Sequence, residues 1–396
     1  MRHRFTKVML GAALFMLLAG TATVAAKSQQ SSASTASYKI GFIYPRTGAL
    51  GAYGAEEIQG FKLGLQYATK GTNKVNGKTL DITYVDDKGD AATGVTAAKD
   101  LIGQGTKILM GTGSSGVAVQ IAPLAAQNQV LYISGPAAAD AITGINKYTF
   151  RAGRQTIQDV LAAKSYLGKA AGKKVVVFDQ DTVFGHGNYA AVKAFFNGHN
   201  VTEVSVPFSA TDFTPFAQQA KNANPDLLFI AWAGTTGGAM FKTLDQQGVY
   251  AGTQVVTGLA ERATWQAFGD PATKINFLSH YVYTAPKNKV NDWLKAKLRG
   301  RNQVPDLFTP DGFVQAQLLV HALEKGDYNV DKMISSLEGY KFLAPKGIQA
   351  IRPQDHAMLQ PMFRVKLVNV NGRLVPAILG TATPYETAPP IVPMKG

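Results

Sequence analysis

Short apolar runs alternate with stretches of helical periodicity along most of the chain. In the first part, the runs typical of buried strands are YKIGFIY (38–44), LDITYVD (80–86), KILMG (107–111) and VLYIS (130–134). The segment AEEIQGFKLGLQYATK lies between the first and second runs and places Ile58, Phe61 and Leu65 on one helical face. The segment AATGVTAAKDLIGQ lies between the second and third runs and has the same periodicity. This alternation predicts a parallel sheet with helices on both faces.

The alternation restarts after the segment FRAGRQTIQD (150–159), which we interpret as a crossover. The predicted strands are KKVVVFDQD (173–181), VTEVSVPF (201–208), DLLFIAW (226–232), TQVVTG (253–258) and INFLSHYVYT (275–284). Helices are expected from about Phe184 to Phe196, in DFTPFAQQAKNA and in GAMFKTLDQQG. The sequence therefore predicts a second α/β unit with the same internal order as the first.

The C-terminal third has a different pattern, which we expect to complete the first two units. Helical periodicity appears in VNDWLKAKLRG and FTPDGFVQAQLLVHALEKG. The segment PMFRVKLVNVNGRLVPAI predicts a hairpin that turns at Asn371 and Gly372, and the Pro-rich tail TPYETAPPIVPMKG is expected to be irregular.

The N-terminus has the three parts of a secretory signal peptide. MRHRFTK is basic, VMLGAALFMLLAG is apolar but short for a membrane span, and TATVAA offers small residues at Val24 and Ala26. We therefore expect a signal peptide over 1–26, cut after Ala26, and a flexible leader over 27–37 in the polar segment that follows.

Charge and cysteine content narrow the function. The 40 basic and 26 acidic residues give a net charge of +14, and removing the three basic residues of 1–26 leaves 37 − 26 = +11. Because these charges are scattered and export is expected, we interpret them as a solvated surface and expect no nucleic-acid partner. The chain has no cysteine, which excludes disulfides, thiolate sites and a lipid-bearing cysteine. A protein of the periplasm without a lipid anchor is therefore predicted.

The glycine-rich loop YPRTGALGAYG (44–54) follows the first strand, but it does not match a phosphate-binding loop. No Lys and Ser or Thr follow Gly54, and the glycine spacing differs from that of a dinucleotide fingerprint. We expect a helix to begin near Ala55, which would place Tyr53 at the lip of a cleft for another kind of small molecule.

Two further strand ends have the composition of a ligand site. In ILMGTGSSGVAVQIAP, Ser114 or Ser115 is expected to cap the next helix, where a hydroxyl and free N–H groups could bind a carboxylate. In YISGPAAADAITG, small residues expose backbone groups. A plain helix cap and a tight connection are the alternatives, but ligands bind where neighbouring parallel strands end.

No catalytic or metal-binding pattern is present. There is no G-x-S-x-G elbow, and the six histidines lack the spacing of metal ligands. Asp86, Asp87 and Asp90 could suggest a metal, but we interpret them as strand-end acids that cap the next helix, and we interpret Asp179 and Asp181 in the same way. We therefore expect no metal site, no cofactor and no enzymatic activity.

The order of these segments resembles one family. KIGFIYPRTGALGAYGAEEIQGFKLGL, DITYVDDKGDAATGVTAAKDLI, ILMGTGSSGVAVQIAPLAAQNQVLYISGPAAA, YTFRAGR and KKVVVFDQDTVFGHG together are similar to the extracellular ligand-binding receptors, the type I periplasmic binding proteins. The likeness is greatest to the leucine–isoleucine–valine binding proteins of ABC transporters. It covers the chain from Tyr38 to about Ile378.

The resemblance implies an α/β fold of two doubly wound parallel-sheet lobes joined by a three-segment hinge. The implied crossings lie near 153–157, 281–285 and 355–361. Lobe 1 would comprise 38–155 and 284–356, and lobe 2 would comprise 156–283 and 357–396. The lobes would close on a ligand that a membrane permease then receives, and we expect a monomer.

The resemblance also implies a set of binding residues. A serine at the start of the third helix holds the carboxylate of amino-acid ligands, and here it is Ser114 or Ser115, assisted by backbone groups of PAAA from Ala137 onward. Ala139 replaces an assisting threonine. The remaining counterparts are an amine-binding tyrosine replaced by Phe184, an aromatic residue at Trp232, and the amine-binding acid at Glu261.

These replacements leave the ligand open. A buried ammonium group needs a carboxylate and hydrogen-bond acceptors, and neither Ala139 nor Phe184 supplies one. The ligand is therefore a branched-chain or other amino acid, or an aromatic or aliphatic carboxylate or amide. A sensing receptor and a hydrolase on the same scaffold are the alternative functions, although no nucleophile–base pair is visible.

Overall fold

The structure is a computed structural model that describes residues 37–168 and 170–395. The predicted signal peptide (1–26) lies outside the described residues, as does the predicted leader (27–37) apart from Ser37. Among the described residues, no helix combines the length and the apolar composition needed to cross a membrane.

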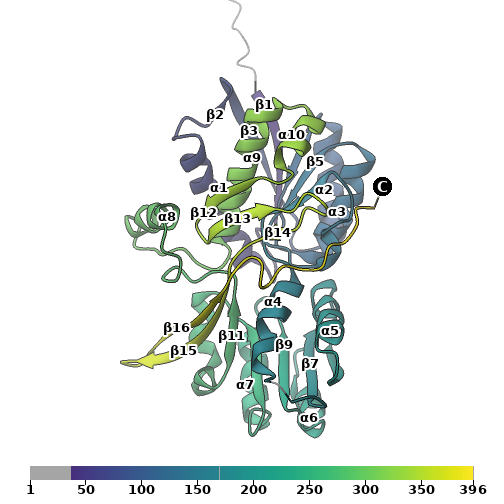
Figure 1. The fold of residues 1–396 in the computed structure, drawn as a ribbon, viewed down its shortest axis with the longest axis vertical. Coiled ribbons are helices and arrows are strands. Elements are labelled where there is room, and N and C mark those ends of the chain that lie inside the picture. The colour runs from purple at the N-terminus through teal and green to yellow at the C-terminus, as the bar shows by residue number, and fades with distance from the viewer. Residues whose placement is uncertain (1–36, 169, 396) are drawn as a thin grey trace, which may run out of the picture. The chain divides into compact units, whose positions relative to one another are not determined.

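The first third of the described chain forms a six-stranded sheet in the order β2-β3-β1-β4-β5-β6 (Figure 1). Its pairs are parallel except for the short edge strand β2, which is antiparallel to β3. The strands are β1 (Ser37–Tyr44), β2 (Lys74–Val75), β3 (Lys78–Asp86), β4 (Ile108–Met110), β5 (Leu131–Ser134) and β6 (Thr149–Arg151). The helices between them are α1 (Gly51–Ala68), α2 (Ala91–Gly103) and α3 (Ser115–Gln127), with a short 3₁₀ turn η1 (Asp140–Ile142).

The second sheet has seven strands in the order β16-β15-β11-β10-β9-β7-β8. The strands β7 to β11 pair in parallel, whereas β15 and β16 are antiparallel additions at one edge. The strands are β7 (Lys174–Gln180), β8 (Asn200–Val206), β9 (Leu227–Ala231), β10 (Gln254–Gly258), β11 (Asn276–Ser279), β15 (Met362–Val370) and β16 (Arg373–Ala382). Its helices are α4 (Thr156–Ala163), η2 (Lys164–Tyr166), α5 (Val183–Phe195), α6 (Thr214–Asn222), α7 (Gly237–Gln246), η3 (Arg262–Phe268) and η4 (Asp270–Thr273).

The segment from α8 to β14 returns to the first sheet. It contains α8 (Lys289–Arg299), α9 (Thr309–Gly326), α10 (Val330–Leu337) and a small sheet of β12 (Lys341–Ala344), β13 (Gly347–Ile351) and β14 (Met358–Leu359). Helix α9 packs directly on α1, and glycines make this close approach possible. A Cβ atom at Gly60 would lie 1.8 Å from the Thr309 carbonyl oxygen, and one at Gly312 would lie 1.9 Å from that of Glu57.

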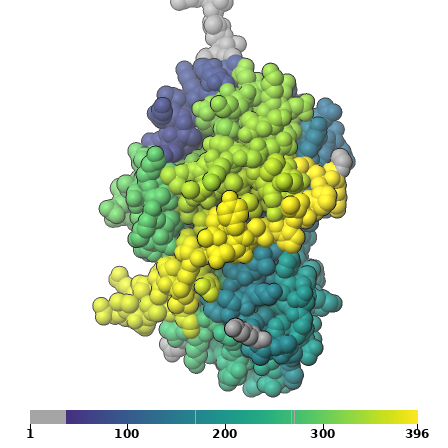
Figure 2. All heavy atoms as spheres, in the orientation of Figure 1, coloured from purple at the N-terminus to yellow at the C-terminus, as the bar shows by residue number. Residues whose placement is uncertain are grey.

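We call the six-stranded sheet with its covering elements lobe 1, and the seven-stranded sheet with its elements lobe 2. The chain passes between them after β6, after β11 and after β14, and it returns to lobe 1 once more after β16. The lobe boundaries given above stay a proposal, with one revision at the C-terminus. The backbone N–H of Val392 donates to the Asp355 carboxylate at 3.1 Å, and that of Lys395 donates to the Gly144 carbonyl at 3.0 Å. We therefore assign the tail after Ala382 to lobe 1; Figure 2 shows this segment in yellow along the junction of the lobes.

Most predicted elements are present, with differences at their ends. Helix α1 begins at Gly51 and not near Ala55, so Tyr53 lies in its first turn. Strand β11 ends at Ser279 because the residues after it form a connection between the lobes, whereas the apolar pattern continues to residue 284. The small sheet of β12 to β14 and helix α10 are additions that the sequence pattern did not indicate.

Candidate functional site

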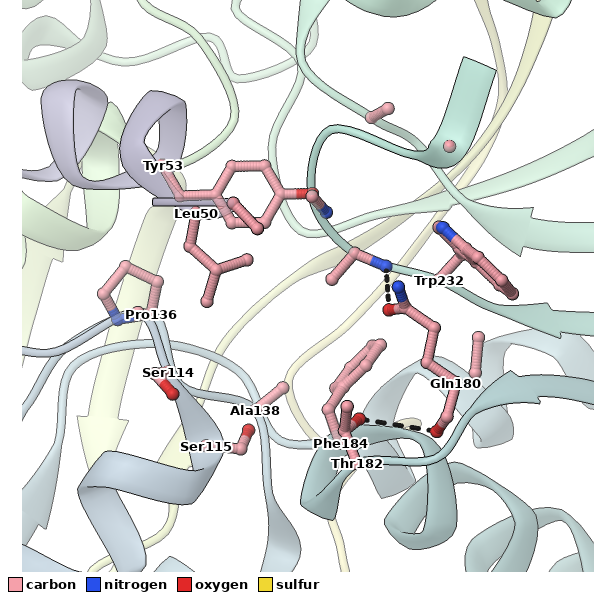
Figure 3. A pocket seen from close by; sticks show the side chains of 18 of the residues that line it. Leu50, Tyr53, Ser114, Ser115, Pro136, Ala138, Gln180, Thr182, Phe184 and Trp232 are labelled. Carbon is pink, nitrogen blue, oxygen red and sulfur yellow. Dashed lines mark hydrogen bonds between the residues drawn. The ribbon is translucent and has the colours of Figure 1, made fainter. Parts of the chain in front are cut away.

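A cavity of about 550 Å³ lies where strands of both sheets end, and residues of both lobes line it (Figure 3). Figure 3 shows Leu50, Tyr53 and Pro136 on one side and Phe184 and Trp232 on the other. Six of the eight residues predicted to bind the ligand line this cavity: Tyr53, Ser114, Ser115, Phe184, Trp232 and Glu261. The predicted residues Ala137 and Ala139 are not among its lining residues, whereas Pro136 and Ala138 are.

The start of helix α3 presents hydrogen-bond donors to the cavity. Ser114 is the N-cap, as predicted for this pair of serines; its hydroxyl accepts from the Val117 N–H at 3.5 Å and donates to the Gly89 carbonyl at 3.2 Å. The Ser115 hydroxyl oxygen accepts from the Ala139 N–H at 3.2 Å. Among the described residues, neither the Ser115 O–H nor the N–H groups of Ser115 and Gly116 have an acceptor. These donors at a helix N-terminus form a site for an anion.

A buried arginine explains why Ala137 and Ala139 face away from the cavity. The guanidinium group of Arg151 is 1% exposed and donates to the carbonyl oxygens of Ala137 at 2.8 Å and Ala139 at 3.1 Å. Both carbonyls therefore point toward the lobe 1 interior. The alternating backbone direction then leaves Ala138 on the cavity side, and its small side chain leaves room for a ligand.

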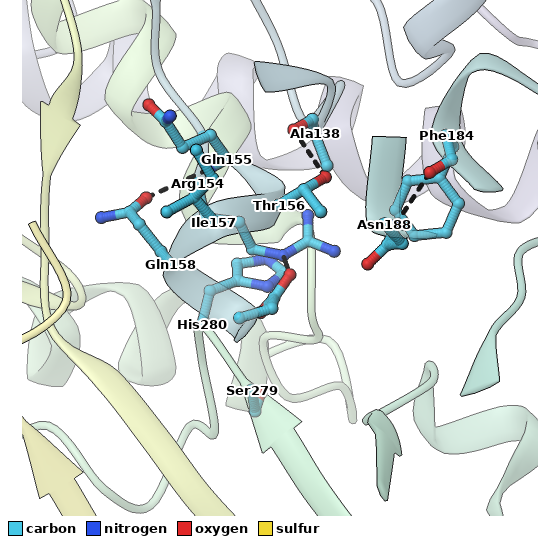
Figure 4. Close-up of polar contacts among 12 residues, drawn as sticks. Ala138, Arg154, Gln155, Thr156, Ile157, Gln158, Phe184, Asn188, Ser279 and His280 are labelled. Carbon is cyan, nitrogen blue, oxygen red and sulfur yellow. Dashed lines mark hydrogen bonds and ion pairs between the residues drawn. The ribbon is translucent and has the colours of Figure 1, made fainter. Parts of the chain in front are cut away.

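Arg154 is a cavity residue that the sequence reasoning missed. Its side chain is only 11% exposed, and its Nε donates to Asp159 Oδ2 at 2.8 Å. Among the described residues, its two terminal nitrogens have no acceptor within hydrogen-bond distance. Figure 4 shows the guanidinium group beside α4, on the side that faces Phe184 and Asn188. The residue lies in the segment FRAGRQTIQD (150–159), which we interpret from the sequence only as a crossover.

Lobe 2 contributes an aromatic wall. The Trp232 indole stacks on Phe178 with ring centroids 5.9 Å apart, and its Nε1–H donates to the Thr236 hydroxyl at 3.0 Å. Because this N–H is already satisfied, the indole acts as an apolar surface. The aromatic residues that line the cavity are Tyr53, Phe184, Phe208, Phe229, Trp232, Phe241, Phe268 and Phe308. A flat apolar ligand body matches such a lining.

The other end of the cavity holds Tyr53 and Glu261. The Tyr53 ring packs on Phe308 at 4.5 Å between centroids, and its hydroxyl accepts from the Gly234 N–H of lobe 2 at 3.1 Å. Glu261 is 7% exposed, and its Oε2 has no hydrogen-bond partner among the described residues. Burial, with the nearby Asp306 carboxylate, raises the pKa of Glu261. This oxygen is available to a ligand group that donates a hydrogen bond.

The acids singled out in the sequence have different roles from one another. Asp90 is the N-cap of α2 and accepts from the Thr93 N–H at 2.8 Å, so the capping interpretation is confirmed for this residue. For Asp179 and Asp181 it is wrong, because Thr182 caps α5.

Among the described residues, the cavity combines the donors at the start of α3, an apolar wall and the free oxygen of Glu261. This set is suited to binding a small molecule.

Comparison with known proteins agrees with this geometry. Residues 37–372 match the model of a family described as periplasmic binding proteins. The Leu/Ile/Val-binding protein BraC3 of Rhizobium johnstonii is 27% identical over 77% of this chain and 84% of its own length.

Two solved structures extend the likeness to the whole fold. An ABC-type branched-chain amino acid transporter protein of Rhodopseudomonas palustris is 32% identical, with a TM-score of 0.74, and the match covers 90% of this chain and 100% of that one. A solute-binding protein of the same species, in complex with 3,4-dihydroxybenzoic acid, is 25% identical with a TM-score of 0.78 over 88% and 97% of the two chains.

Proposed function

This chain belongs to the periplasmic binding protein family, and from that premise we propose that it captures an aromatic carboxylate between its two lobes. Membership makes it a small-molecule-binding component of an ABC transporter and not an enzyme. The hydrolase alternative is therefore set aside.

The observation that carries the proposal is that Arg154 and the N-terminus of α3 line the same cavity. Two terminal guanidinium nitrogens and the donors at Ser115 face one cavity without acceptors from the described residues. A guanidinium group matches the two oxygens of a carboxylate, and the helix N-terminus adds a favourable field. A ligand carboxylate would satisfy all these donors at once.

The aromatic lining supports a benzoate-like body for the ligand. Phe184 and Trp232 from lobe 2 and Pro136 and Ala138 from lobe 1 line the cavity. Aromatic rings stack favourably in such a slot. A hydroxyl on the ring would also be able to donate to the free oxygen of Glu261, which an unsubstituted benzoate leaves unsatisfied.

A branched-chain amino acid is the second candidate, and the same oxygen of Glu261 favours it. A buried ammonium group requires a carboxylate partner, and Glu261 is the acid that the family resemblance assigns to this role. Relatives named as Leu/Ile/Val-binding proteins support this candidate as well. An amino acid has a positively charged ammonium group and an aromatic carboxylate has none, so the two ligand classes should respond differently to the loss of Glu261.

The cellular role follows from the family. We propose export by the signal peptide over 1–26, action as a monomer in the periplasm without a lipid anchor, and delivery of the ligand to a membrane permease. The residues that fit these steps are the basic and apolar N-terminal segments and the absence of cysteine. A sensing receptor would use the same closure of the lobes, so closure does not distinguish sensing from transport. A permease gene next to the gene of this protein would favour transport.

Titration calorimetry on protein refolded to remove bound ligand tests the proposal. The panel contains benzoate, 4-hydroxybenzoate, 3,4-dihydroxybenzoate, leucine and phenylalanine, and mass spectrometry identifies any ligand released from natively purified protein. We expect the hydroxybenzoates to bind most tightly and Glu261→Gln to weaken them by less than a factor of about ten. Tight binding of leucine that Glu261→Gln abolishes would favour the amino-acid candidate and reject the aromatic one.

A further inference from the structure

A second polar cluster lies on lobe 2, formed by Asp179 on β7, Glu203 on β8 and His186 on α5. Asp179 pairs with Ser205 across the two parallel strands, so Glu203, two positions before Ser205, lies on the same face of the sheet. The first turn of α5 brings His186 over this face. Gly185 makes the approach possible, because a Cβ atom there would lie 2.7 Å from Asp179 Oδ2.

The side chains of the cluster are arranged around the imidazole ring. Nε2 of His186 lies 2.8 Å from Asp181 Oδ1, whereas Nδ1 lies 3.2 Å from Glu203 Oε1 and 3.9 Å from Asp179 Oδ2. One ligand atom from each of Asp179, His186 and Glu203 lies within 4.8 Å of the others. If the Nε2–H donates to Asp181, the lone pair of Nδ1 points toward two carboxylates.

Asp179 is the member of this cluster whose charge is least compensated by the residues around it. Its side chain is 0% exposed, and both of its oxygens are without a hydrogen-bond partner among the described residues. A buried carboxylate with no hydrogen-bond donor is costly. A protonated His186 would supply a single positive charge to three carboxylates, including that of Asp181, and its nearest nitrogen is 3.9 Å from Asp179.

We propose that Asp179, His186 and Glu203 bind a divalent transition-metal ion of the zinc class. Imidazole with two carboxylates is a ligand set typical of zinc, whereas calcium and magnesium prefer sites made of oxygen alone. Asp181 would orient the ring through Nε2, which is a common second partner of a metal-bound histidine. Tetrahedral coordination needs ligand atoms roughly 3.4 Å apart, so small side-chain rotations suffice.

The exposure of the cluster allows a metal ion to enter it from solution. His186 is 51% exposed and Glu203 26% exposed, so the ion reaches the site from the lobe 2 surface and water can fill a fourth position. The proposal concerns a site separate from the carboxylate site, and it replaces the sequence-based expectation of no metal. Spacing along the chain missed it because Glu203 joins from the neighbouring strand.

Zinc titration of the untagged protein, dialysed first against EDTA, tests the proposal. Calorimetry at pH 7.5 is expected to give one zinc ion per chain, and cobalt is expected to give the visible absorption of a tetrahedral site. His186→Gln and Glu203→Gln should each weaken zinc binding roughly tenfold or more, while His199→Gln, a histidine of the same lobe outside the cluster, should not. Asp181→Asn should weaken binding but retain the cobalt spectrum.

The outcomes are distinguishable from a failure to fold. Each variant is compared with the wild type by circular dichroism and by thermal unfolding in EDTA, and zinc should raise the unfolding temperature of the wild type and of His199→Gln more than that of the His186 and Glu203 variants. The proposal would be overturned if the wild type did not bind zinc stoichiometrically. It would also be overturned if the His186 and Glu203 variants both bound zinc as tightly as the wild type. Either result would mean that a proton, and not a metal ion, compensates the charge of the cluster.

Discussion

The hydroxyl oxygen of Tyr53 accepts a hydrogen bond from the backbone N–H of Gly234 at 3.1 Å, and this bond joins lobe 1 to lobe 2 across the cavity mouth. The Arg262 N–H of lobe 2 donates in the same way to Asp306 of lobe 1 at 3.0 Å. Both bonds require the lobes to be close together, so they are formed in the closed state that retains a ligand.

Tyr53→Phe is therefore expected to weaken ligand binding without changing the lining of the cavity. One net hydrogen bond is worth about 0.5–1.5 kcal/mol, which corresponds to a roughly two- to tenfold loss of affinity for 4-hydroxybenzoate by calorimetry. Tyr84→Phe is the control, because the Tyr84 hydroxyl has no hydrogen-bond partner among the described residues. Equal effects of the two substitutions would show that the cross-lobe bond does not contribute to binding.

Arg154→Ala should reduce the affinity for benzoate-class ligands roughly ten- to a hundredfold, since a hydrogen bond to a charged group is worth about 1.5–3 kcal/mol. The double variant Arg154→Ala, Asp159→Asn avoids leaving the Asp159 carboxylate unpaired. Calorimetry with benzamide separates the roles, because an uncharged amide should lose much less than benzoate. The exposed Arg373 on β16 provides the control substitution to alanine. Equal losses for benzoate and benzamide would argue against a carboxylate at Arg154.

The two serines at the start of α3 should have separable roles. Ser115→Ala removes a free O–H donor at the cavity and is expected to weaken carboxylate binding roughly tenfold or more. Ser114→Ala removes the N-cap and should mainly lower the free energy of unfolding, by about 0.5–2 kcal/mol. Chemical denaturation measures the free energy of unfolding of both variants, and calorimetry measures their affinity. If Ser114→Ala mainly lowered the affinity and Ser115→Ala mainly lowered the stability, the two assignments would be wrong.

Asp87 gives a prediction for the pH dependence of stability. Burial raises the pKa of this carboxyl from 3.8 to about 6, although its carboxylate accepts from Thr112 and from the Gly89 N–H at 2.7 Å. Between about pH 4 and 6 the folded state therefore holds more protons than the unfolded state, and the contribution of Asp87 to stability falls as the pH rises. Asp87→Asn should remove this decrease in urea denaturation series.

Asp90 is the matched control for that experiment. The hydrogen bonds from Thr93 lower its pKa, so its contribution is present at neutral pH and is lost as the pH falls through the folded pKa. The differences between the wild type and the two asparagine variants should thus have opposite slopes with pH. Slopes of the same sign would contradict the burial argument for Asp87.

The close approach of α1 and α9 predicts an asymmetry between two glycines. Gly312→Ala would place a methyl group 1.9 Å from the Glu57 carbonyl oxygen, so the helices must separate, at a cost of about 1–3 kcal/mol or more. Gly103→Ala near the end of α2 has open space around its Cβ position and should be neutral or stabilising by up to about 1 kcal/mol. Thermal unfolding of both variants checks the difference, and a neutral Gly312→Ala would mean that the helices pack less tightly than described.

Patterns local in sequence predicted most of the strands and helices because side-chain periodicity reflects burial within a single element. They also predicted an N-cap at Ser114 or Ser115, which is Ser114, whereas the family resemblance placed Phe184 at the cavity. The helix α1 was predicted four residues short because glycines and Tyr53 in its first turn resemble loop residues, although a helix packed on a neighbour tolerates them.

Features that form only where segments distant in the sequence come together could not be predicted from local patterns. Arg154 was hidden because a single arginine carries no information about a cavity that another lobe completes. Ala137 was assigned to the site, but the buried Arg151 turns its carbonyl inward, and no pattern near position 137 indicates that contact. Glu203 and His186 are brought together by strand pairing and helix placement, neither of which follows from their separation in the sequence.

The contact between α1 and α9 also has a consequence for the order in which the chain acquires structure. Glu57 Oε1 accepts from the buried Gln315 side chain at 2.9 Å, across a separation of 258 residues. A chain synthesised or translocated from its N-terminus presents α1 long before α9 exists, while the strands β7 to β11 form a contiguous segment in between. The parallel strands of lobe 2 can therefore form before α9 is made, with β15 and β16 added later, and the apolar face of α1 stays unpaired until α9 arrives. A holding chaperone would encounter the protein with the lobe 1 sheet not yet covered by α9, so export before folding is compatible with the topology.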